Sequence, residues 1–474
     1  MSARYITTTL PYVNADPHIG FALEAIQADV LVRSWRAQGD DVFFNTGTDE
    51  HGQKLFEAAK KAGKEVQAYV DHYAGEFKKL SEALGLDNPT FIRTTDDKHV
   101  RAAEEMWKRC AKTGDIYEKE YEGLYCVGHE AFITEKELVD GKCPDHGVAP
   151  QKLKEKNYFF NFKKYEPYLK EYLSKLGVIL PEWRRQEAIT FVEGGLEDFS
   201  ISREKERLSW GIPVPSDDSQ VMYVWFDALT SYISTLGWPE EGGDFKKYWV
   251  DGETLQVAGK DQIRFQSLIW QAMLKSAGLP ATKSVFYHGF INSGGKKMSK
   301  SLGNVINAHD LVKKYGTDAV RYILLRHVSP TEDSDLTLEA IGDHYTAHLT
   351  NGLGNFVARV MKLCEDNLEG PISFPPEMSQ DQEEIQKDIT RFAFHTALDR
   401  IFSLITAADE RITREEPFKV IKSDPERGKA MLSALAFTLL NIGQLLTPFM
   451  PSTSRLIIEA VTKNKKPENL FPRI

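Results

Sequence analysis

Short runs of β-branched and aromatic residues alternate with amphipathic helical patterns through the first hundred residues of the chain. Residues 5–9 and 41–45 predict strands, and residues 19–36 and 53–62 predict helices. A helix between two strands carries the chain back across the sheet, so that the strands run in parallel. The alternation therefore predicts an α/β fold built on a Rossmann-like parallel sheet.

This pattern stops after Gly114, which divides the chain into regions of different character. We predict one half of the sheet domain at 1–114, an inserted domain at 115–215 and the second half at 216–292. Strand-like runs at 220–226 and 254–257 suggest that the sheet resumes there. A connecting region follows at 293–342. Apolar spacings of three and four at 356–364, 389–413 and 429–446 predict an all-α helix bundle at 343–474.

Composition excludes several classes of protein. Hydrophobic residues make up 42% and charged residues 27% of the 474 residues, which is typical of a globular protein and not of a disordered one. No stretch reaches the roughly 18 apolar residues of a membrane span, and no apolar run marks a signal peptide at the N-terminus. Four cysteines are too few for a disulfide scaffold, so we expect a cytoplasmic protein. The net charge of -10 argues against a protein that coats nucleic acid without sequence specificity.

The segment TTTLPYVNADPHIGF joins a predicted strand to a predicted helix. Asp16 is suited to cap this helix and Pro17 to open it, which puts His18 in the first turn. The free N–H groups of a helix N-terminus attract anions, phosphates above all. Gly20 allows a flat ligand to approach the backbone. By itself, the segment favours an ordinary helix start, with His18 as a helix-start residue on a polar loop.

A second segment, GGKKMSKSLGN at 294–304, combines a glycine pair with closely spaced lysines. Lys297 and Lys300 can place two positive charges on a polyphosphate, with the Ser299 hydroxyl beside them. A solvated basic loop is the alternative interpretation.

Taken together, the two segments resemble the two signatures of class I aminoacyl-tRNA synthetases, which hold ATP during amino-acid activation. The chain is most similar to the methionyl-tRNA synthetases, through segments that include FNTGTDEHGQK, YVWFDAL, GKDQIRFQSLIW, KKMSKSLGN and YGTDAVRYILLR. The resemblance implies that methionine is activated by ATP to methionyl-adenylate and transferred to tRNA(Met). It also implies that the sheet domain is catalytic, that 293–342 holds the lysine loop and a stem-contact region, and that the helix bundle reads the anticodon.

The resemblance also implies roles for individual residues. The methionine pocket corresponds to Leu10, Tyr12, Asp49, Trp225, Ala228, Leu229, Tyr232 and Phe265. The ATP-binding residues correspond to His18, Gly20, Asp261, His288, Gly289, Lys297, Met298, Ser299 and Lys300, with His18, Lys297 and Lys300 assisting catalysis together with Mg²⁺. The anticodon contacts correspond to Asn355, Arg359, Pro417 and Phe418. Core packing for the aromatic residues, a local backbone contact for His288 and a helix-start role for Phe418 remain alternatives.

Two Cys-x2-His pairs, Cys126 with His129 and Cys143 with His146, lie within the predicted insert. Thiolate and imidazole ligands at this spacing predict a tetrahedral structural Zn²⁺ site. The resemblance points to the same zinc knuckle, although the family usually has cysteine at the position of His129. A knuckle that has lost its metal is the alternative.

Two departures from the family pattern fall at the predicted site: Phe21 stands in place of a second signature histidine, and Gln266 in place of a histidine beside the methionine. A synthetase for another apolar or thiol amino acid therefore remains possible, as does a tRNA-binding paralogue without catalysis. The chain ends after the helical region, without an appended domain, and we expect a monomer. Lysines in the tail are candidate phosphate contacts or solubilising residues: Lys463, Lys465 and Lys466.

Overall fold

A computed structural model describes residues 2–126, 131–133, 135–144, 147–298, 303–372 and 380–474. The chain forms two compact units. The first comprises Met1–Asp16, Asp40–Lys79 and Asn88–Tyr287, and the second comprises Pro17–Gly39, Leu80–Asp87 and His288–Ile474.

The first unit is built on a six-stranded sheet with the order β3-β2-β1-β12-β13-β7. Its strands are β1 (Ala3–Thr8), β2 (Asp41–Thr48), β3 (Thr90–Arg93), β7 (Ile179–Leu180), β12 (Glu253–Gly259) and β13 (Ser284–His288). Strand β1 pairs in parallel with both β2 and β12, so that Tyr5 lies opposite Phe43 on one side and Thr254 on the other. The predicted α/β class with a parallel sheet is confirmed.

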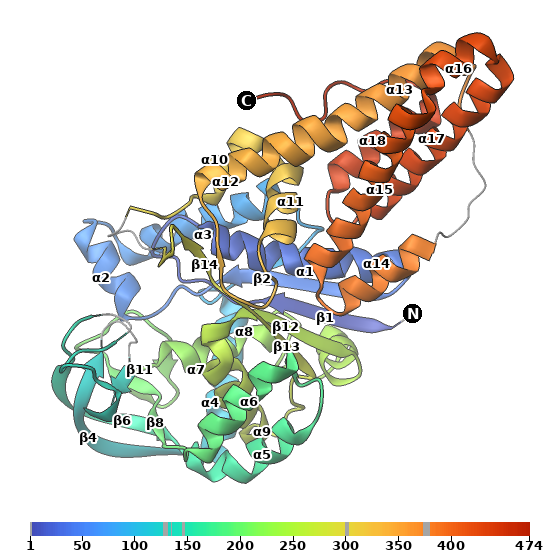
Figure 1. Ribbon diagram of the computed structural model, residues 1–474. Coiled ribbons are helices and arrows are strands. Elements are labelled where there is room, and N and C mark those ends of the chain that lie inside the picture. Colours follow the sequence, from blue (N-terminus) through green and yellow to red (C-terminus); the bar gives the residue numbers. More distant parts are fainter. Residues whose placement is uncertain (1, 127–130, 134, 145–146, 299–302, 373–379) are drawn as a thin grey trace. The chain divides into compact units, whose positions relative to one another are not determined.

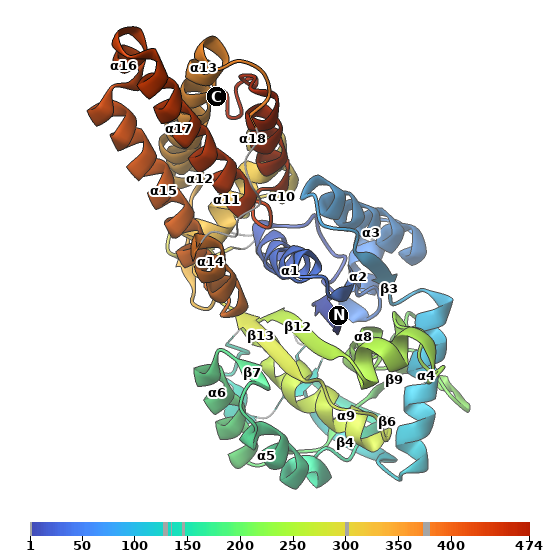
Figure 2. The ribbon, with the colours of Figure 1, turned by 90° about the vertical axis from the view of Figure 1, so that its right-hand side faces the viewer.

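Apolar helices cover one face of this sheet. Helices α4 (Asp97–Lys112) and α9 (Trp270–Ser276) contribute Trp107 and Trp270 to the same core cluster as Tyr5 of β1 and Tyr287 of β13 (Figure 2). The remaining helices centred in this unit are α2 (Gln53–Lys61), α3 (Val66–Ala83, whose last turn belongs to the second unit), α5 (Glu166–Ser174), α6 (Glu182–Glu193), α7 (Val224–Leu229) and α8 (Ser231–Ser234).

Two smaller antiparallel sheets belong to the region between β3 and β12. One has the order β5-β4-β6-β8, from β4 (Ile116–Cys126), β5 (Ala131–Ile133), β6 (Gln151–Phe160) and β8 (Phe199–Ser200). The other has the order β10-β11-β9, from β9 (Ser202–Glu204), β10 (Pro213–Val214) and β11 (Asp217–Met222). The parallel sheet therefore does not resume at 220–226 as expected. Residues there end β11 and begin α7, whereas β7 of the intervening region pairs with β13 in the parallel sheet.

The second unit is mainly helical, and its long helices α13, α15, α17 and α18 lie side by side (Figure 1). Its helices are α1 (Ile19–Ala37), α10 (Ala308–Tyr315), α11 (Thr317–His327), α12 (Leu338–His344), the π-helical segment η7 (Tyr345–Gly354), α13 (Asn355–Asn367), α14 (Gln380–Thr390), α15 (Phe394–Glu415), α16 (Pro417–Ser423), α17 (Pro425–Leu445) and α18 (Pro451–Lys463). A buried ion pair of 2.7 Å between Asp29 and Arg321 joins α1 to α11.

The predicted all-α bundle is confirmed, but the single helix expected at 389–413 is wrong. The chain turns between α14 and α15, where Phe392 has a φ of 60°. A positive φ is unfavourable for a side chain with a Cβ and cannot continue a right-handed helix. In the described part of the chain, no helix is both long and apolar enough to cross a lipid bilayer.

Candidate functional site

The candidate site begins at the carboxyl ends of three neighbouring strands in the first unit. Leu10 and Tyr12 follow β1, Asp49 follows β2, and Asp261 follows β12. The chain continues from β1 to β2 on one side, while β12 occupies the other side of β1. In an open parallel sheet, ligands bind outside the carboxyl ends at the point where the strand order reverses. The predicted methionine and ribose residues therefore lie where this fold places a ligand.

Aromatic side chains gather beside these strand ends. Trp225 of α7 stacks on Phe265 of the π-helical segment η5 (Ile263–Ile269), with ring centroids 3.9 Å apart and planes at 16°. Both rings pack on the core cluster that includes Leu10, Leu229 and Tyr232. The structure thus brings together the apolar residues that the sequence assigned to methionine, with Ala228 buried on the same helix as Trp225.

Asp49 is 2% exposed, and the backbone on both sides fixes its position. Its N–H donates to the Pro11 carbonyl at 3.0 Å, and its own carbonyl accepts from Val13 at 3.4 Å. These bonds extend the pairing of β1 and β2 beyond the strands and hold Tyr12 opposite Asp49. A buried carboxylate held in a fixed position is suited to bind an ammonium group.

Asp227, the fully buried aspartate of the YVWFDAL segment, has a role that the sequence did not reveal. Its two carboxylate oxygens bond to Nδ1 of His51 at 2.8 Å and to Nε2 of His99 at 2.9 Å. Burial opposes ionisation of this carboxyl, but the two imidazoles outweigh it and hold the pKa of Asp227 below its ordinary value. The network fixes α7, and with it Trp225, against α4 and the segment that follows β2.

Glu50 forms a second buried network that the sequence did not reveal. Its carboxylate accepts two bonds of 2.7 Å from Arg93, and its backbone carbonyl accepts a bond of 2.6 Å from the Trp210 indole. Because Glu50 directly follows Asp49, these contacts stiffen the segment that carries the predicted ammonium ligand. Only the clustering of charged residues in GTDEHGQK could have suggested this network from the sequence.

In the second unit, His18 is the N-cap residue of α1, and the predicted capping by Asp16 is wrong. The Gly20 N–H donates to His18 Nδ1 at 3.0 Å, which makes the imidazole the capping acceptor. A Cβ on residue 20 would lie 2.8 Å from the His18 ring, so glycine is needed for this cap. The ring reaches solvent, while the protein atoms around it lower the pKa of His18 by desolvation.

The segment after the lysine loop pairs with the start of α1. Ile19 donates to the Ile306 carbonyl at 3.2 Å, and Ala308 donates to the Pro17 carbonyl at 3.4 Å. These backbone bonds bring the residues that follow the second signature segment to the start of α1 within the second unit, almost 300 residues away in the sequence.

The glycine pair of the lysine loop forms a tight hairpin. Strands β14 (Ile291–Ser293) and β15 (Lys296–Lys297) pair in antiparallel, and Gly294 and Gly295 have φ of 66° and 71°. Positive φ at both central residues is the type I′ requirement that glycine meets without strain. Lys297 is exposed, with its Nζ 5.0 Å from the centre of the Phe290 ring, and Met298 follows it. Ser299 and Lys300 lie outside the described residues.

His288 and Gly289 are held by contacts within the second unit. His288 Nδ1 lies 2.7 Å from the Gly289 carbonyl oxygen, and Nε2 lies 2.9 Å from the Glu24 carboxylate. A Cβ on residue 289 would lie 2.1 Å from the backbone of Glu332. Both residues therefore have structural roles in addition to their predicted position near the nucleotide.

The predicted metal site is described in part. Cys126 and Cys143 are buried in one small cluster with Ile133, which fits a pair of thiolate ligands approaching one ion. Their predicted partners, His129 and His146, lie outside the described residues. The donor set of two thiols and two imidazoles is chemically suited to Zn²⁺.

The predicted anticodon residues are on two helices that both pack against α17. Asn355 is exposed at the start of α13, and Arg359 of the same helix pairs with Asp409 at 3.0 Å. Pro417 is buried and Phe418 half-buried at the start of α16, which fits the helix-start role as well as base stacking. The Arg359 guanidinium would have to exchange its carboxylate partner for a base.

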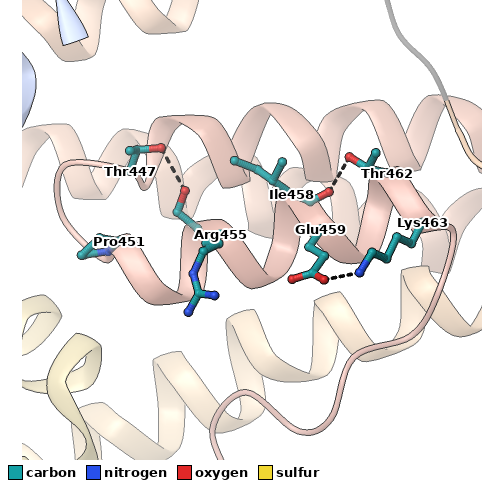
Figure 3. A pocket seen from close by; sticks show the side chains of 8 residues that line it. Thr447, Pro451, Arg455, Ile458, Glu459, Thr462 and Lys463 are labelled. Carbon is teal, nitrogen blue, oxygen red and sulfur yellow. Dashed lines mark hydrogen bonds and ion pairs between the residues drawn. The ribbon is translucent and has the colours of Figure 1, made fainter.

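A cavity of about 400 Å³ lies along α18 and is lined largely by aliphatic carbon (Figure 3). Lys463 lies at one end of this cavity and pairs with Glu459. This ion pair neutralises Lys463 locally, which weakens its candidacy as a phosphate contact. The strand-end residues do not line this cavity.

Comparison with known proteins agrees with the fold and with this arrangement. The family model described as tRNA synthetases class I (M) matches residues 4–152 and 146–361. A methionine–tRNA ligase from Brucella suis biovar 1 is 38% identical over 480 residues, covering 98% of this chain and 92% of the relative. One from Thermotoga maritima is 37% identical, covering 98% and 76%. The Mycobacterium tuberculosis methionyl-tRNA synthetase in complex with methionyl-adenylate superposes with a TM-score of 0.92 at 34% identity, covering 100% of both chains.

The parallel sheet, the residues at its strand ends and the two paired signature segments are those of a class I aminoacyl-tRNA synthetase. Within that class, this chain belongs to the methionyl-tRNA synthetase family.

Proposed function

We propose that this chain activates methionine with ATP and transfers the methionyl group to tRNA through the residues described above. The chain is thus an ATP-dependent methionine–tRNA ligase. The observations that support the residue assignment are the pairing of Tyr12 with Asp49 beyond the carboxyl ends of β1 and β2, and the Trp225–Phe265 stack, which packs on the same core cluster as Tyr12. Another apolar substrate is less compatible with an aromatic wall, because a thioether gains from sulfur–aromatic contacts.

In the first step, the methionine carboxylate attacks the α-phosphorus of ATP, and pyrophosphate leaves. The protein supplies no nucleophile, so its contribution is positioning and stabilisation of charge. Asp49 binds the substrate ammonium, and the Trp225–Phe265 stack with Tyr232 encloses the side chain. Asp261, at the carboxyl end of β12, accepts hydrogen bonds from the ribose.

His18 contributes a hydrogen-bond donor to the phosphates. Because its Nδ1 accepts the Gly20 N–H, this nitrogen carries no proton, and the neutral ring has its proton on Nε2. The cap therefore selects the tautomer whose N–H faces away from the helix. The lowered pKa keeps the ring in this neutral form near pH 7. The positive end of α1 adds a favourable field for phosphate.

The lysine loop neutralises the departing pyrophosphate. Lys297 is exposed and, in the described contacts, meets an aromatic ring, so its ammonium is available to an incoming phosphate. We assign the same role to Lys300. Mg²⁺ bound to the nucleotide would neutralise part of the negative charge of the polyphosphate.

Several further assignments complete the proposal. Zn²⁺ at the Cys126, His129, Cys143 and His146 site would hold the inserted region and take no part in the chemistry. Asn355, Arg359, Pro417 and Phe418 would contact anticodon bases, since amide and guanidinium groups bond base edges and aromatic rings stack on unpaired bases. A monomeric state and a cytoplasmic location remain predictions, the first testable by sedimentation.

Amino-acid-dependent exchange of pyrophosphate into ATP tests the proposed function. Exchange with methionine, and not with leucine, isoleucine, valine or cysteine, is expected. Exchange with another amino acid instead would keep the class of reaction and overturn the assigned substrate. Folded protein that catalyses no exchange in the presence of Mg²⁺ would support a tRNA-binding role without catalysis.

A further inference from the structure

Three histidines to which no role has been assigned above meet in the second unit. His327 ends α11, His344 ends α12, and His348 lies one turn further on, in η7. One ligand nitrogen from each ring lies within 4.8 Å of the other two. Among the described residues, these histidines form the one group of three or more His, Cys, Asp or Glu side chains with this geometry.

The spacing of two of these nitrogens matches a metal site. Nδ1 of His348 lies 3.3 Å from Nε2 of His327. Two imidazole ligands on a tetrahedral ion, with bonds of 2.0–2.1 Å, have their nitrogens about 3.3–3.4 Å apart. The His344 ring lies parallel to the His327 ring, at 3.6 Å and 2°. One ring nitrogen of His344 lies within 4.8 Å of the ligand nitrogens of the other two histidines.

The charge state of the cluster suits a cation. Burial lowers the pKa of all three rings, and their mutual repulsion and Arg326 add to this effect at His327, where the pKa falls to about 3. Lowering of the pKa favours the neutral imidazole, which is the form that binds metals. Arg326 forms an ion pair with Asp399 at 2.7 Å. The negative charge of Asp343 opposes the lowering of the His344 pKa, and that of Asp399 opposes the lowering of the His348 pKa.

The cluster also has a route for an ion and room for a fourth ligand. A cavity of about 470 Å³ is lined by His348 together with Arg326, Phe402 and Glu410. Water in this cavity could complete a tetrahedral site.

We propose that His327, His344 and His348 bind a divalent transition metal ion of the zinc, nickel and copper group. Three imidazoles without a carboxylate favour these ions over Mg²⁺ and Ca²⁺, which require oxygen ligands. The ion clamps the end of α11 to the junction of α12 and η7. This site is separate from the predicted zinc knuckle in both position and ligand chemistry.

Cobalt titration of the full chain tests the proposal, because Co²⁺ substitutes for Zn²⁺ and its absorption reports its ligands. After chelator treatment and dialysis, the unmodified chain should bind one Co²⁺ with visible ligand-field bands and no thiolate-to-cobalt charge transfer. Cobalt bound at the predicted zinc knuckle would show this charge-transfer band, because its ligands include thiolates, and can therefore be counted separately. H348Q and H344F should each lose the histidine-type Co²⁺, and H344F retains an aromatic ring to stack on His327. The control H309Q removes another half-buried histidine of the same unit and should bind as the unmodified chain does.

A thermal-melting measurement gives a second readout. Added Ni²⁺ should raise the melting temperature of the unmodified chain and of H309Q but not that of H348Q or H344F. The proposal is overturned if all four proteins bind Co²⁺ equally, or if charge-transfer bands account for all the bound cobalt. Loss of fold in one cluster variant, seen by circular dichroism, would leave the other variant to decide.

Discussion

The residues assigned to methionine differ from Lys297, which is assigned to the departing pyrophosphate, in how firmly the protein holds their side chains. In the first unit, Asp49 and Tyr232 are buried, and networks centred on Glu50 and Asp227 support the surrounding segments. In the second unit, Lys297 is exposed on a two-residue strand and has an aromatic ring as its described neighbour. One set is assembled before the ligand arrives, whereas the other is free to follow it.

This difference corresponds to two uses of binding energy. A preassembled pocket binds the substrate in its ground state and selects it by shape. A mobile ammonium that meets phosphate only as charge develops lowers the barrier without tightening substrate binding. The comparison therefore predicts that substitutions in the first set change the KM for methionine, and that substitutions in the second set change kcat.

The largest expected effect is that of K297A. Removal of a charge that stabilises the leaving pyrophosphate should lower kcat for adenylate formation by roughly 10²–10³-fold, while the KM for methionine changes little. The control is K296A, which removes the adjacent exposed lysine of the same strand and should be nearly silent. Single-turnover adenylate formation measures both. If the KM for methionine rose as steeply as kcat fell in K297A, the proposed division of roles would be wrong.

D49N tests the other side of the comparison. The amide keeps the shape of the side chain but removes its charge from the substrate ammonium, a contact of about 1.5–3 kcal/mol. The KM for methionine should rise by roughly 10–10²-fold, with the KM for ATP unchanged. Pyrophosphate exchange at varied methionine and varied ATP separates the two. An unchanged KM for methionine would remove Asp49 from the pocket.

The sequence predicted the layout of the fold because periodicity and motif position are local signals. The alternation of strands and helices predicted β1, α1, β2 and α2 to within a few residues, and the motif residues Leu10, Asp49 and Asp261 follow the carboxyl ends of strands. Two errors arose from local backbone and capping geometry that hydrophobic periodicity does not reveal. His18 caps α1 because its ring accepts the Gly20 N–H, and α14 ends before α15 because Phe392 takes a positive φ. The Asp227 network could not be predicted, because His51 and His99 meet it only in the folded chain.

D227N should weaken the support of the pocket. The asparagine amide has one acceptor oxygen where the carboxylate had two, and neither imidazole keeps a charged partner, at a cost of about 1.5–3 kcal/mol in the free energy of unfolding. Urea denaturation at pH 7 measures this loss. Because α7 carries Trp225, the KM for methionine should rise as well. A variant that is destabilised elsewhere in the protein should keep its KM for methionine.

The same substitution should change how stability depends on pH. A carboxyl whose pKa is below its ordinary value in the folded state stabilises the protein fully above that ordinary value of 3.8 and loses its contribution as the pH falls through the lowered one. The unmodified chain should therefore lose stability more steeply than D227N below about pH 4. Parallel curves for the two proteins would show that Asp227 does not ionise differently in the two states.

The smallest expected effect is that of Q266L, at the position where the family usually has a histidine. The Gln266 amide donates to the Tyr232 hydroxyl at 2.5 Å, while its Oε1 is buried without a hydrogen-bond partner. Leucine removes the bond to Tyr232 but also relieves the unpartnered oxygen, and these two contributions of about 1 kcal/mol oppose each other. The KM for methionine should change by less than about 5-fold, and norleucine, which lacks the sulfur, should be affected less than methionine. A change of 10²-fold or more would mean that Gln266 contacts the substrate itself, so that a residue interpreted as support for Tyr232 would belong to the pocket wall.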